Sequence, residues 1–419
     1  MSKRTLSFIT GVESYSKKRL AVGIPAYHCE PTVEDTLSSI NMQSIRDDIE
    51  VVISPDDDHD YNYLKDLYKN LDITILPNPE VNAGPGVARQ KVLNYLYDTD
   101  SKIEWVTFID ADDVFFTPHS LENLMLKAKN TVCVQGIFLQ ELDGNTYRNM
   151  GGTQPRQLNP QDPHVANPNR FMPDPSVNPC HPWVFGRIYN VKFLKDNDIT
   201  FGTLRAMEDG FFNQHLRMLS ADTNRRTVYA GEQVYLWRVG SEHSITRVGI
   251  KENGGIPLYN FDLCPVGATV SFMDALYLVK KKHPISQAVS EAVAQHMVGQ
   301  YTSYEECLVE RPMFAKQAIF NAKRFYLLYK EIESLMTKDY LFTFMSQAYM
   351  QYAAKYGKAP SMSFEEFMDM IKNANYGGEK EWDAIRSELP QWVIDLDMKS
   401  GVLGSEGFVQ SIYEKENNI

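Results

Sequence analysis

Apolar and amphipathic segments alternate along the first third of the chain. Short apolar runs rich in β-branched residues predict strands at residues 20–24, 49–53, 73–76 and 105–109. Apolar residues at helical spacing predict helices at residues 33–40, 61–71 and 87–97. Thr32 is the expected N-cap of the first helix, with Asp35 in the place of the usual capping-box Glu. Strands that alternate with helices at this spacing predict an α/β fold with a mixed, mostly parallel, doubly wound sheet.

The middle of the chain continues this pattern with one long interruption. Apolar segments predict strands at residues 132–139 and 234–238, and helices near 190–196 and from Glu208 onward. Residues 151–182 contain eight prolines and few large apolar residues, which predicts a long irregular loop. Loops of this length inside a compact domain are usually functional or disordered, and both interpretations stay open at this point.

After about residue 250 the pattern becomes helical throughout. Apolar residues at helical spacing predict helices at residues 285–297, 316–337 and 382–389. Ser363 and Glu366 have the spacing of a capping box and predict one more helix start. We therefore predict two domains, a sheet domain over residues 1–250 and a mainly α-helical domain over residues 251–419.

Composition narrows the class of protein. The chain has 419 residues, with Lys+Arg 42 against Asp+Glu 54, and this net charge of −12 argues against a general affinity for nucleic acids or anionic membranes. The five cysteines are widely spaced and form no CxxC pair, which favours a reducing cytoplasm over a disulfide or zinc framework. No run approaches the roughly 20 apolar residues of a membrane span. We expect a cytoplasmic protein without a transmembrane segment.

The stretch with the clearest candidate metal-binding residues directly follows the strand predicted at residues 105–109. Alternation along an extended chain points Asp110 and Asp112 the same way. Two adjacent carboxylates repel each other, and a hard divalent cation such as Mn²⁺ or Mg²⁺ with oxygen ligands would relieve this repulsion. Such an ion is useful when diphosphate oxygens complete its coordination, because it then neutralises a leaving group. The simpler interpretation is an acidic turn, and this motif alone does not exclude it.

Two further strand ends carry unusual polar residues. Pro25 and Tyr27 end the first strand, and Asp56 follows the second. The carboxyl ends of parallel strands meet at one edge of a sheet, where ligands gather. An aromatic ring can stack on a base, and a carboxylate can accept a hydrogen bond from a uracil N–H. Together these residues predict a nucleotide site, with Arg89 left to face the diphosphate, although each residue alone is explained by packing or turn formation.

The order of these segments resembles the family 2 glycosyltransferases of GT-A fold. The strings that carry the resemblance are Ile24-Pro-Ala-Tyr27, the acids after Ile53, Asn82-Ala-Gly-Pro-Gly-Val-Ala-Arg89 and Phe108-Ile-Asp-Ala-Asp-Asp113. The resemblance spans residues 20–247 and is strongest over 78–113. Pro55 stands where the family often has its first Asp, which makes Asp56 the best match to the second, and Gln90 stands where Asn is commoner.

The resemblance implies a Rossmann-like, metal-dependent, inverting hexosyl- or pentosyltransferase that moves a sugar from a nucleotide-sugar, expected to be UDP-linked, to an acceptor hydroxyl. It implies that Asp209 is the catalytic base, with Glu208 beside it. It implies that His243 is a further metal ligand and that Trp183 faces the acceptor. Under this interpretation, the proline-rich loop at residues 151–182 is either a lid over the acceptor site or a flexible insertion without a role in the reaction.

Several alternatives stay open from the residues alone. A nucleotidyltransferase can share this sheet architecture, although residues 20–35 contain only one glycine, Gly23, where such enzymes carry a glycine-rich loop. A non-catalytic carbohydrate- or partner-binding protein is a second alternative. The acceptor could be a glycan, a lipid carrier, a protein or, as a minority hypothesis, a hydroxymethylated base in DNA. A basic groove for DNA would need the arginines at 217, 225, 226, 238 and 247.

Overall fold

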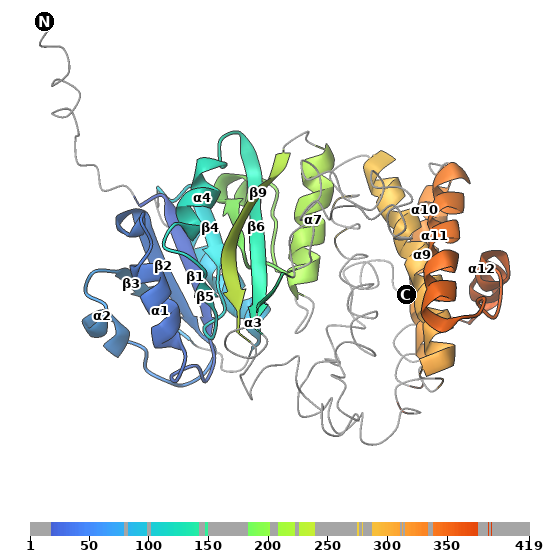
Figure 1. Cartoon of the computed structure of the whole chain (residues 1–419), viewed down its shortest axis with the longest axis horizontal. Coiled ribbons are helices and arrows are strands. Elements are labelled where there is room, and N and C mark those ends of the chain that lie inside the picture. The colour runs from blue at the N-terminus through green and yellow to red at the C-terminus, as the bar shows by residue number, and fades with distance from the viewer. Residues whose placement is uncertain are drawn as a thin grey trace, which may run out of the picture.

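The structure is a computed structural model of the chain. It describes residues 18–78, 83–98, 102–141, 147–149, 183–201, 208–222, 226–238, 275, 279, 287–310, 312, 315–333, 338–375, 384 and 387. Figure 1 shows the sheet in the N-terminal half, a group of helices from the C-terminal half, and helix α7 between them. The boundary predicted at residue 250 lies outside the described residues and stays a prediction.

One mixed nine-stranded sheet forms the core of the N-terminal half. Its order is β3(Asp72–Ile75), β2(Ile49–Pro55), β1(Leu20–Ala26), β4(Trp105–Phe108), β8(Arg187–Asn190), β6(Thr131–Glu141), β9(Arg226–Trp237) and β5(Val114–Phe115), and β7(Tyr147–Asn149) pairs with β6. Strands β3, β2, β1 and β4 run parallel to one another, whereas β8 is antiparallel to both of its neighbours. The predicted α/β class and mixed sheet are therefore confirmed. The parallel strands bring their carboxyl ends to one edge.

Helices cover both faces of this sheet. They are α1(Val33–Asn41), α2(Tyr63–Leu67), α3(Pro85–Asp98), α4(Ser120–Leu126), α6(Val191–Asp196) and α7(Glu208–Asp222). The predicted N-cap position of α1 is correct, but the predicted capping bond is wrong. Thr32 has a ψ of −28°, which is not the extended conformation of an N-cap, and its Oγ1 donates to the carbonyl of Cys29 instead.

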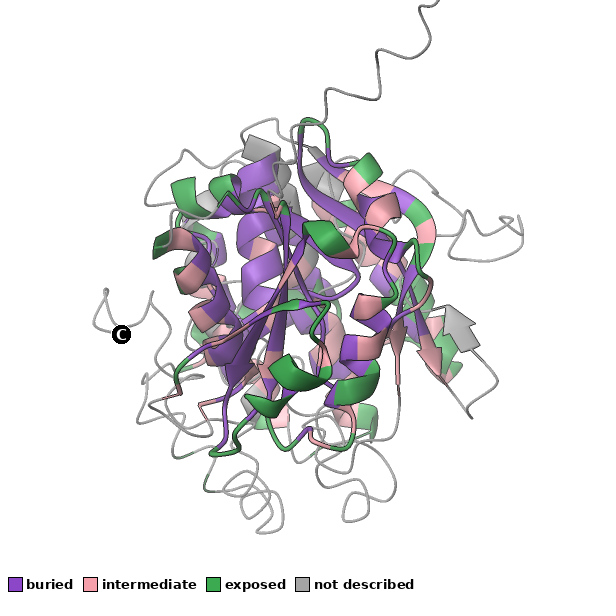
Figure 2. Cartoon of the chain, turned by 90° about the vertical axis from the view of Figure 1, so that its left-hand side faces the viewer, coloured by how far each residue is buried: buried purple, intermediate pink, exposed green. Residues whose placement is uncertain are grey.

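The sheet divides the apolar interior into two clusters. Alternate residues of the same strand contribute to opposite clusters, as Val51 and Val52 of β2 do. Figure 2 shows that buried residues fill the sheet and that exposed residues gather on the peripheral helices and turns. One cluster lies on the α1, α2 and α4 side. The other contains residues of α3, α6 and α7 and continues into the C-terminal helices.

Most of the described C-terminal residues are helical, as predicted. They form α9(Gln287–Glu310), α10(Ala315–Ile332), α11(Lys338–Tyr356) and α12(Phe364–Asn373). The capping box of α12 is confirmed, because Ser363 Oγ accepts from the Glu366 amide at 3.1 Å and Glu366 Oε2 accepts from the Ser363 amide at 2.7 Å. In the helix predicted at 382–389, only residues 384 and 387 are described, and both are helical.

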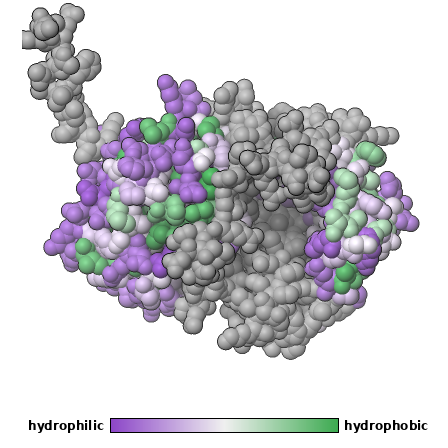
Figure 3. Space-filling view, in the orientation of Figure 1, coloured by the Kyte–Doolittle hydropathy of each residue, from purple (hydrophilic) through white to green (hydrophobic). Residues whose placement is uncertain are grey.

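The sequence pattern did not predict helix α11, and it also missed the short elements α4, β5, β7 and β8. The apolar residues of α11 occur around the whole helix, so that Ala348 and Tyr352 are buried whereas Phe342 is 71% exposed. On the face seen in Figure 3, the described surface is a mixture of hydrophilic and hydrophobic residues. No described helix is long and apolar enough to cross a bilayer.

Candidate active site

The carboxyl-terminal edge of the parallel strands gathers several of the predicted site residues. Pro25 is the penultimate residue of β1 and pairs with Ser54 of β2. Tyr27 follows β1 and is 41% exposed, and Asp56 follows β2. Asp110 lies two residues after β4. These segments are separated in sequence, and the sheet places their strand ends side by side (Figure 1).

A buried arginine connects this edge to the start of α7. Arg89 of α3 is 5% exposed and donates from Nη1 to Glu208 Oε1 and from Nη2 to Asp110 Oδ1, both at 2.6 Å. Although burial works in the opposite direction, the charges of Asp110 and Glu208 hold the pKa of Arg89 above its ordinary value. Both Nη atoms are thus engaged by carboxylates. The predicted contact of Arg89 with a diphosphate stays a prediction.

Asp209 lies next to Glu208, but among the described residues its hydrogen-bond partner is a backbone amide and not the Arg89 guanidinium. It is half-buried, and its Oδ1 accepts a hydrogen bond from the amide of Gly210 at 2.7 Å. Burial and the neighbouring charge of Glu208 raise the pKa of Asp209 to about 7, against the opposing effect of Arg89. Burial also raises the pKa of Glu208, whose charge Arg89 stabilises directly. The start of α7 therefore holds one carboxylate paired with a cation and one carboxylate that titrates near neutral pH.

The acidic turn after β4 is held in place by its third carboxylate. Asp113 is 1% exposed and accepts from the Tyr235 hydroxyl at 2.5 Å and from the Arg238 amide at 2.7 Å. The same hydroxyl accepts from the amide of Asp110 at 3.3 Å. Burial and the charges of Asp112 and Asp110 raise the pKa of Asp113 well above its ordinary value. Sequence reasoning missed the structural pair of Asp113 and Tyr235, because only the fold brings β9 beside this turn.

Two of the three metal ligands predicted from sequence, Asp110 and Asp112, are described residues. The Asp110 side chain is 34% exposed, and Asp112 is half-buried on the same turn. His243 lies outside the described residues. Among the described residues, no group of three or more His, Cys, Asp or Glu side chains could hold a metal ion. The two carboxylates are oxygen donors of the kind that Mn²⁺ and Mg²⁺ prefer, and they would need further ligands from a substrate.

Asp56 holds the loop before α3. It is 4% exposed, and its two oxygens accept hydrogen bonds from the amides of Ala83 at 2.7 Å and Gly84 at 2.8 Å. Gly84 has a φ of 100°, which a residue with a side chain rarely adopts. This geometry favours a structural role for Asp56. The predicted hydrogen bond from Asp56 to a uracil N–H stays a prediction.

Asp57 connects the loop that carries Tyr27 to the end of β2, and sequence reasoning assigned it no role. Its buried carboxylate accepts from the His28 amide at 2.5 Å, the Tyr61 hydroxyl at 2.9 Å and the His59 amide at 3.2 Å. His28 has a φ of 47°, an uncommon conformation for a non-glycine residue. The bond to the His28 amide fixes this turn directly after Tyr27.

Trp183 belongs to an aromatic layer beside the acidic turn. Its ring centroid lies 5.9 Å from that of Phe185, with the planes inclined by 17°, and Phe185 in turn stacks on Tyr235 at 4.6 Å. Tyr235 is the residue whose hydroxyl holds Asp113. Trp183 is half-buried, and its predicted contact with an acceptor stays a prediction.

Residues 21–189 match the profile of Glycosyl transferase family 2, which covers most of the segment where the resemblance was recognised. No curated protein sequence matches the chain. Among solved structures, S. aureus TarS matches with a TM-score of 0.53 and 15% identity, over 84% of this chain and 55% of that chain. TarS 1-349 in complex with UDP matches with a TM-score of 0.49 and 15% identity, over 84% of this chain and 90% of that chain. Mannosyltransferase PcManGT from Pyrobaculum calidifontis, in complex with GDP-Man and Mn²⁺, matches with a TM-score of 0.44 and 13% identity, over 85% of this chain and 84% of that chain.

The family match begins in β1, ends in β8 and includes the Asp110–Asp113 turn. At 15% identity the TarS match shows a shared fold. Residues 21–189 are therefore similar to the family 2 glycosyltransferases, the fold is of the GT-A type, and the protein is a glycosyltransferase.

Proposed function

We propose that this protein transfers a sugar from a nucleotide-sugar, with a UDP-sugar as the expected donor, to an acceptor hydroxyl with inversion at the anomeric carbon. The observation that carries the proposal is the arrangement at the start of α7. Arg89 pairs with Glu208 and Asp110, which leaves Asp209 without a cationic hydrogen-bond partner among the described residues. A carboxylate whose pKa is about 7 is suited to accept a proton at neutral pH.

The donor lies along the strand edge in this proposal. Tyr27 is exposed at the end of β1 and can stack on the base. Asp110 and Asp112 would hold a Mn²⁺ or Mg²⁺ ion, which supplies positive charge to the diphosphate leaving group when bound. Asp110 keeps Oδ1 on Arg89, so only its Oδ2 is left for an ion. His243 is a further ligand in the proposal.

The chemical step uses Asp209 as a general base. The acceptor oxygen forms a bond to the anomeric carbon while the bond from that carbon to the diphosphate breaks. Asp209 takes the proton of the acceptor hydroxyl, and the diphosphate keeps the electron pair of the broken bond. No carboxylate nucleophile is required, so the acceptor attacks from the face opposite the diphosphate. Glu208 acts as a positioning residue, because Arg89 fixes it beside the base.

The alternative acceptor in DNA is not supported by the arginines that it needs. Arg238 pairs with Asp35 at 2.9 Å, and Arg217 lines a cavity between helices. The side chains of the other three arginines lie outside the described residues. A glycan, a lipid carrier and a protein stay as the proposed acceptor classes.

A donor screen tests the proposal. The full chain is incubated with UDP- and GDP-sugars and Mn²⁺, and released nucleoside diphosphate is measured. We expect release from a UDP-sugar that depends on the metal, and NMR of the product from an α-linked donor should show an inverted linkage. A retained linkage would overturn the assigned chemistry, and metal-independent release at full rate would overturn the metal site.

A further inference from the structure

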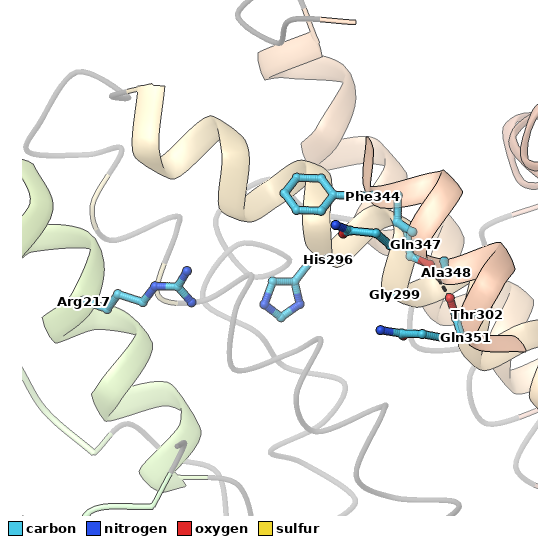
Figure 4. Close-up of a pocket in the computed structure, with 9 residues that line it drawn as sticks. Arg217, His296, Gly299, Thr302, Phe344, Gln347, Ala348 and Gln351 are labelled. Atoms are coloured by element: carbon cyan, nitrogen blue, oxygen red, sulfur yellow. Dashed lines mark hydrogen bonds between the residues drawn. The ribbon is translucent and has the colours of Figure 1, made fainter. Parts of the chain in front are cut away.

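A cavity lies away from the strand edge, between α7, α9 and α11. Its volume is about 350 Å³, and the polar side chains of Arg217, His296, Thr302, Gln347 and Gln351 contribute to its wall. In Figure 4, Arg217 extends from α7 toward His296 of α9, and the amides of Gln347 and Gln351 point inward from α11. Arg217 lies eight residues after Asp209 on α7. This spacing separates the cavity from the catalytic base by about 12 Å along the helix axis.

Arg217 brings to this cavity a positive charge that no described carboxylate pairs with. No carboxylate of the described residues forms an ion pair with its guanidinium, and none of the described lining residues is acidic. Burial lowers the pKa of Arg217 to about 10, so the group stays charged at neutral pH. A half-buried charge that no described residue pairs with is unfavourable, and an anion in the cavity would compensate it.

The opposite wall offers hydrogen bonds to a neutral group. Gln347 Oε1 is buried and accepts no hydrogen bond from a described residue. Burial and the charge of Arg217 lower the pKa of His296 to about 3, so its imidazole is neutral. Thr302 Oγ1 donates to the carbonyl of Val298, which leaves the hydroxyl oxygen as an acceptor. A ligand with hydroxyl donors would satisfy Gln347 and Thr302 on this side.

We propose that this cavity binds a small hydroxylated anion of the sugar-phosphate class, with the phosphate at Arg217 and the hydroxyls toward Gln347. A volume of about 350 Å³ lies at the small end of known ligand pockets, which fits one phosphorylated sugar or polyol. The site is separate from the donor site described above. The inference does not depend on the sugar, metal or acceptor that the active site uses.

Calorimetry on the full chain tests this site. The probes are glucose 6-phosphate, glycerol phosphate, inorganic phosphate and glucose. We expect at least one of the two phosphorylated probes to bind with higher affinity than phosphate or glucose. Asp112→Asn should leave this binding unchanged, because Asp112 lies at the donor site. If neither phosphorylated probe binds, the proposal is overturned. Equal affinity for inorganic phosphate would overturn the hydroxylated class and leave a bare oxyanion site.

Variants of the cavity distinguish a ligand contact from a structural role. Arg217→Gln should weaken binding of the phosphorylated probe by about 10- to 100-fold, the usual effect of losing a charged hydrogen bond. Gln347→Leu should weaken it less and leave the weak binding of inorganic phosphate unchanged. Arg46→Gln, which removes a charge from an exposed ion pair, is the matched control and should change nothing.

The melting temperature of the ligand-free protein provides the second measurement. Arg217→Gln removes a half-buried charge that no described residue pairs with, so the melting temperature should stay the same or rise. A marked fall would show that Arg217 is structural and would overturn the proposal. If Arg217→Gln does not fold, Arg217→Lys keeps the charge and should retain binding within about tenfold.

Discussion

Arg89 Nη1 donates a hydrogen bond of 2.6 Å to Glu208 Oε1, and 119 positions of sequence separate the two residues. The same guanidinium contacts Asp110, so one cation connects α3, the turn after β4 and the start of α7. Arg89 and Glu208 are both buried, where charges are stable only when they are paired. The position of the proposed base therefore depends on a residue that need not touch the substrate.

Arg89→Met should destabilise the protein by about 3–5 kcal/mol, because it leaves two carboxylates without their cation. Urea unfolding at pH 7 measures this free energy. The double variant Arg89→Met with Glu208→Gln should lose less free energy of unfolding than the two single variants lose together. The reason is that Glu208→Gln removes one of the carboxylates that Arg89→Met leaves uncompensated. Strictly additive losses would contradict the pairing.

Asp209→Asn should lower turnover by about 10²–10⁴-fold, the usual contribution of a general base. Donor affinity should not change, because the base acts on the acceptor. Initial rates and calorimetry with the donor measure the two effects separately. Asp58→Asn, an exposed change of the same chemistry, is the control. Near-normal turnover in Asp209→Asn would mean that another group takes the proton.

The pKa of about 7 for Asp209 predicts two opposite pH effects. A base must be deprotonated, so turnover should rise with pH and reach half its plateau near pH 7. Stability should change in the other direction, because the folded state keeps a proton that the unfolded state releases near 3.8. The resulting stability is present at low pH and is lost as pH rises through about 7. Asp209→Asn should therefore raise the melting temperature relative to wild type more at pH 8 than at pH 5.

Asp112→Asn should remove metal-dependent donor binding, since it deletes one of two carboxylates available to the ion. Calorimetry with UDP in the presence and absence of Mn²⁺ measures this loss. UDP binding without metal should be the same in both proteins. If Mn²⁺ strengthens UDP binding equally in the variant, the ion binds elsewhere.

Asp57→Asn should raise the KM for the donor more than it lowers kcat. The change weakens the hydrogen bond to the His28 amide and so loosens the turn that presents Tyr27. Tyr27→Ala should also raise the KM for the donor more than it lowers kcat. The effects of the two substitutions on KM should not add, because both act through the contact of Tyr27 with the donor. Asp58→Asn, which lies next to it but is exposed, is again the control. A fall in kcat without a change in KM would place Asp57 outside the donor site.

Local patterns predicted six of the nine strands, most helices and the strand ends at the candidate site, because a buried strand and a capping box each depend on a few adjacent residues. The capping box of Ser363 was predicted correctly in this way. The pairs Arg89–Glu208 and Asp113–Tyr235 were not predicted, because their partners meet only through the sheet topology. Helix α11 was missed for a different reason, since its apolar residues do not keep to one face. The capping bond predicted for Thr32 does not form, because the backbone at Thr32 is not in the extended conformation that an N-cap side chain requires.

Helix α7 begins with Glu208 and the proposed base Asp209 and also contacts α9, and both helices contribute to one apolar cluster. On the ribosome, α7 is made well before α9, and its apolar face then has no partner from the C-terminal helices. The helix that positions the base can reach its final packing only after α9 has left the exit tunnel. The enzyme should therefore acquire activity late in its synthesis, and a nascent chain that stops before α9 should remain exposed to chaperones and proteases.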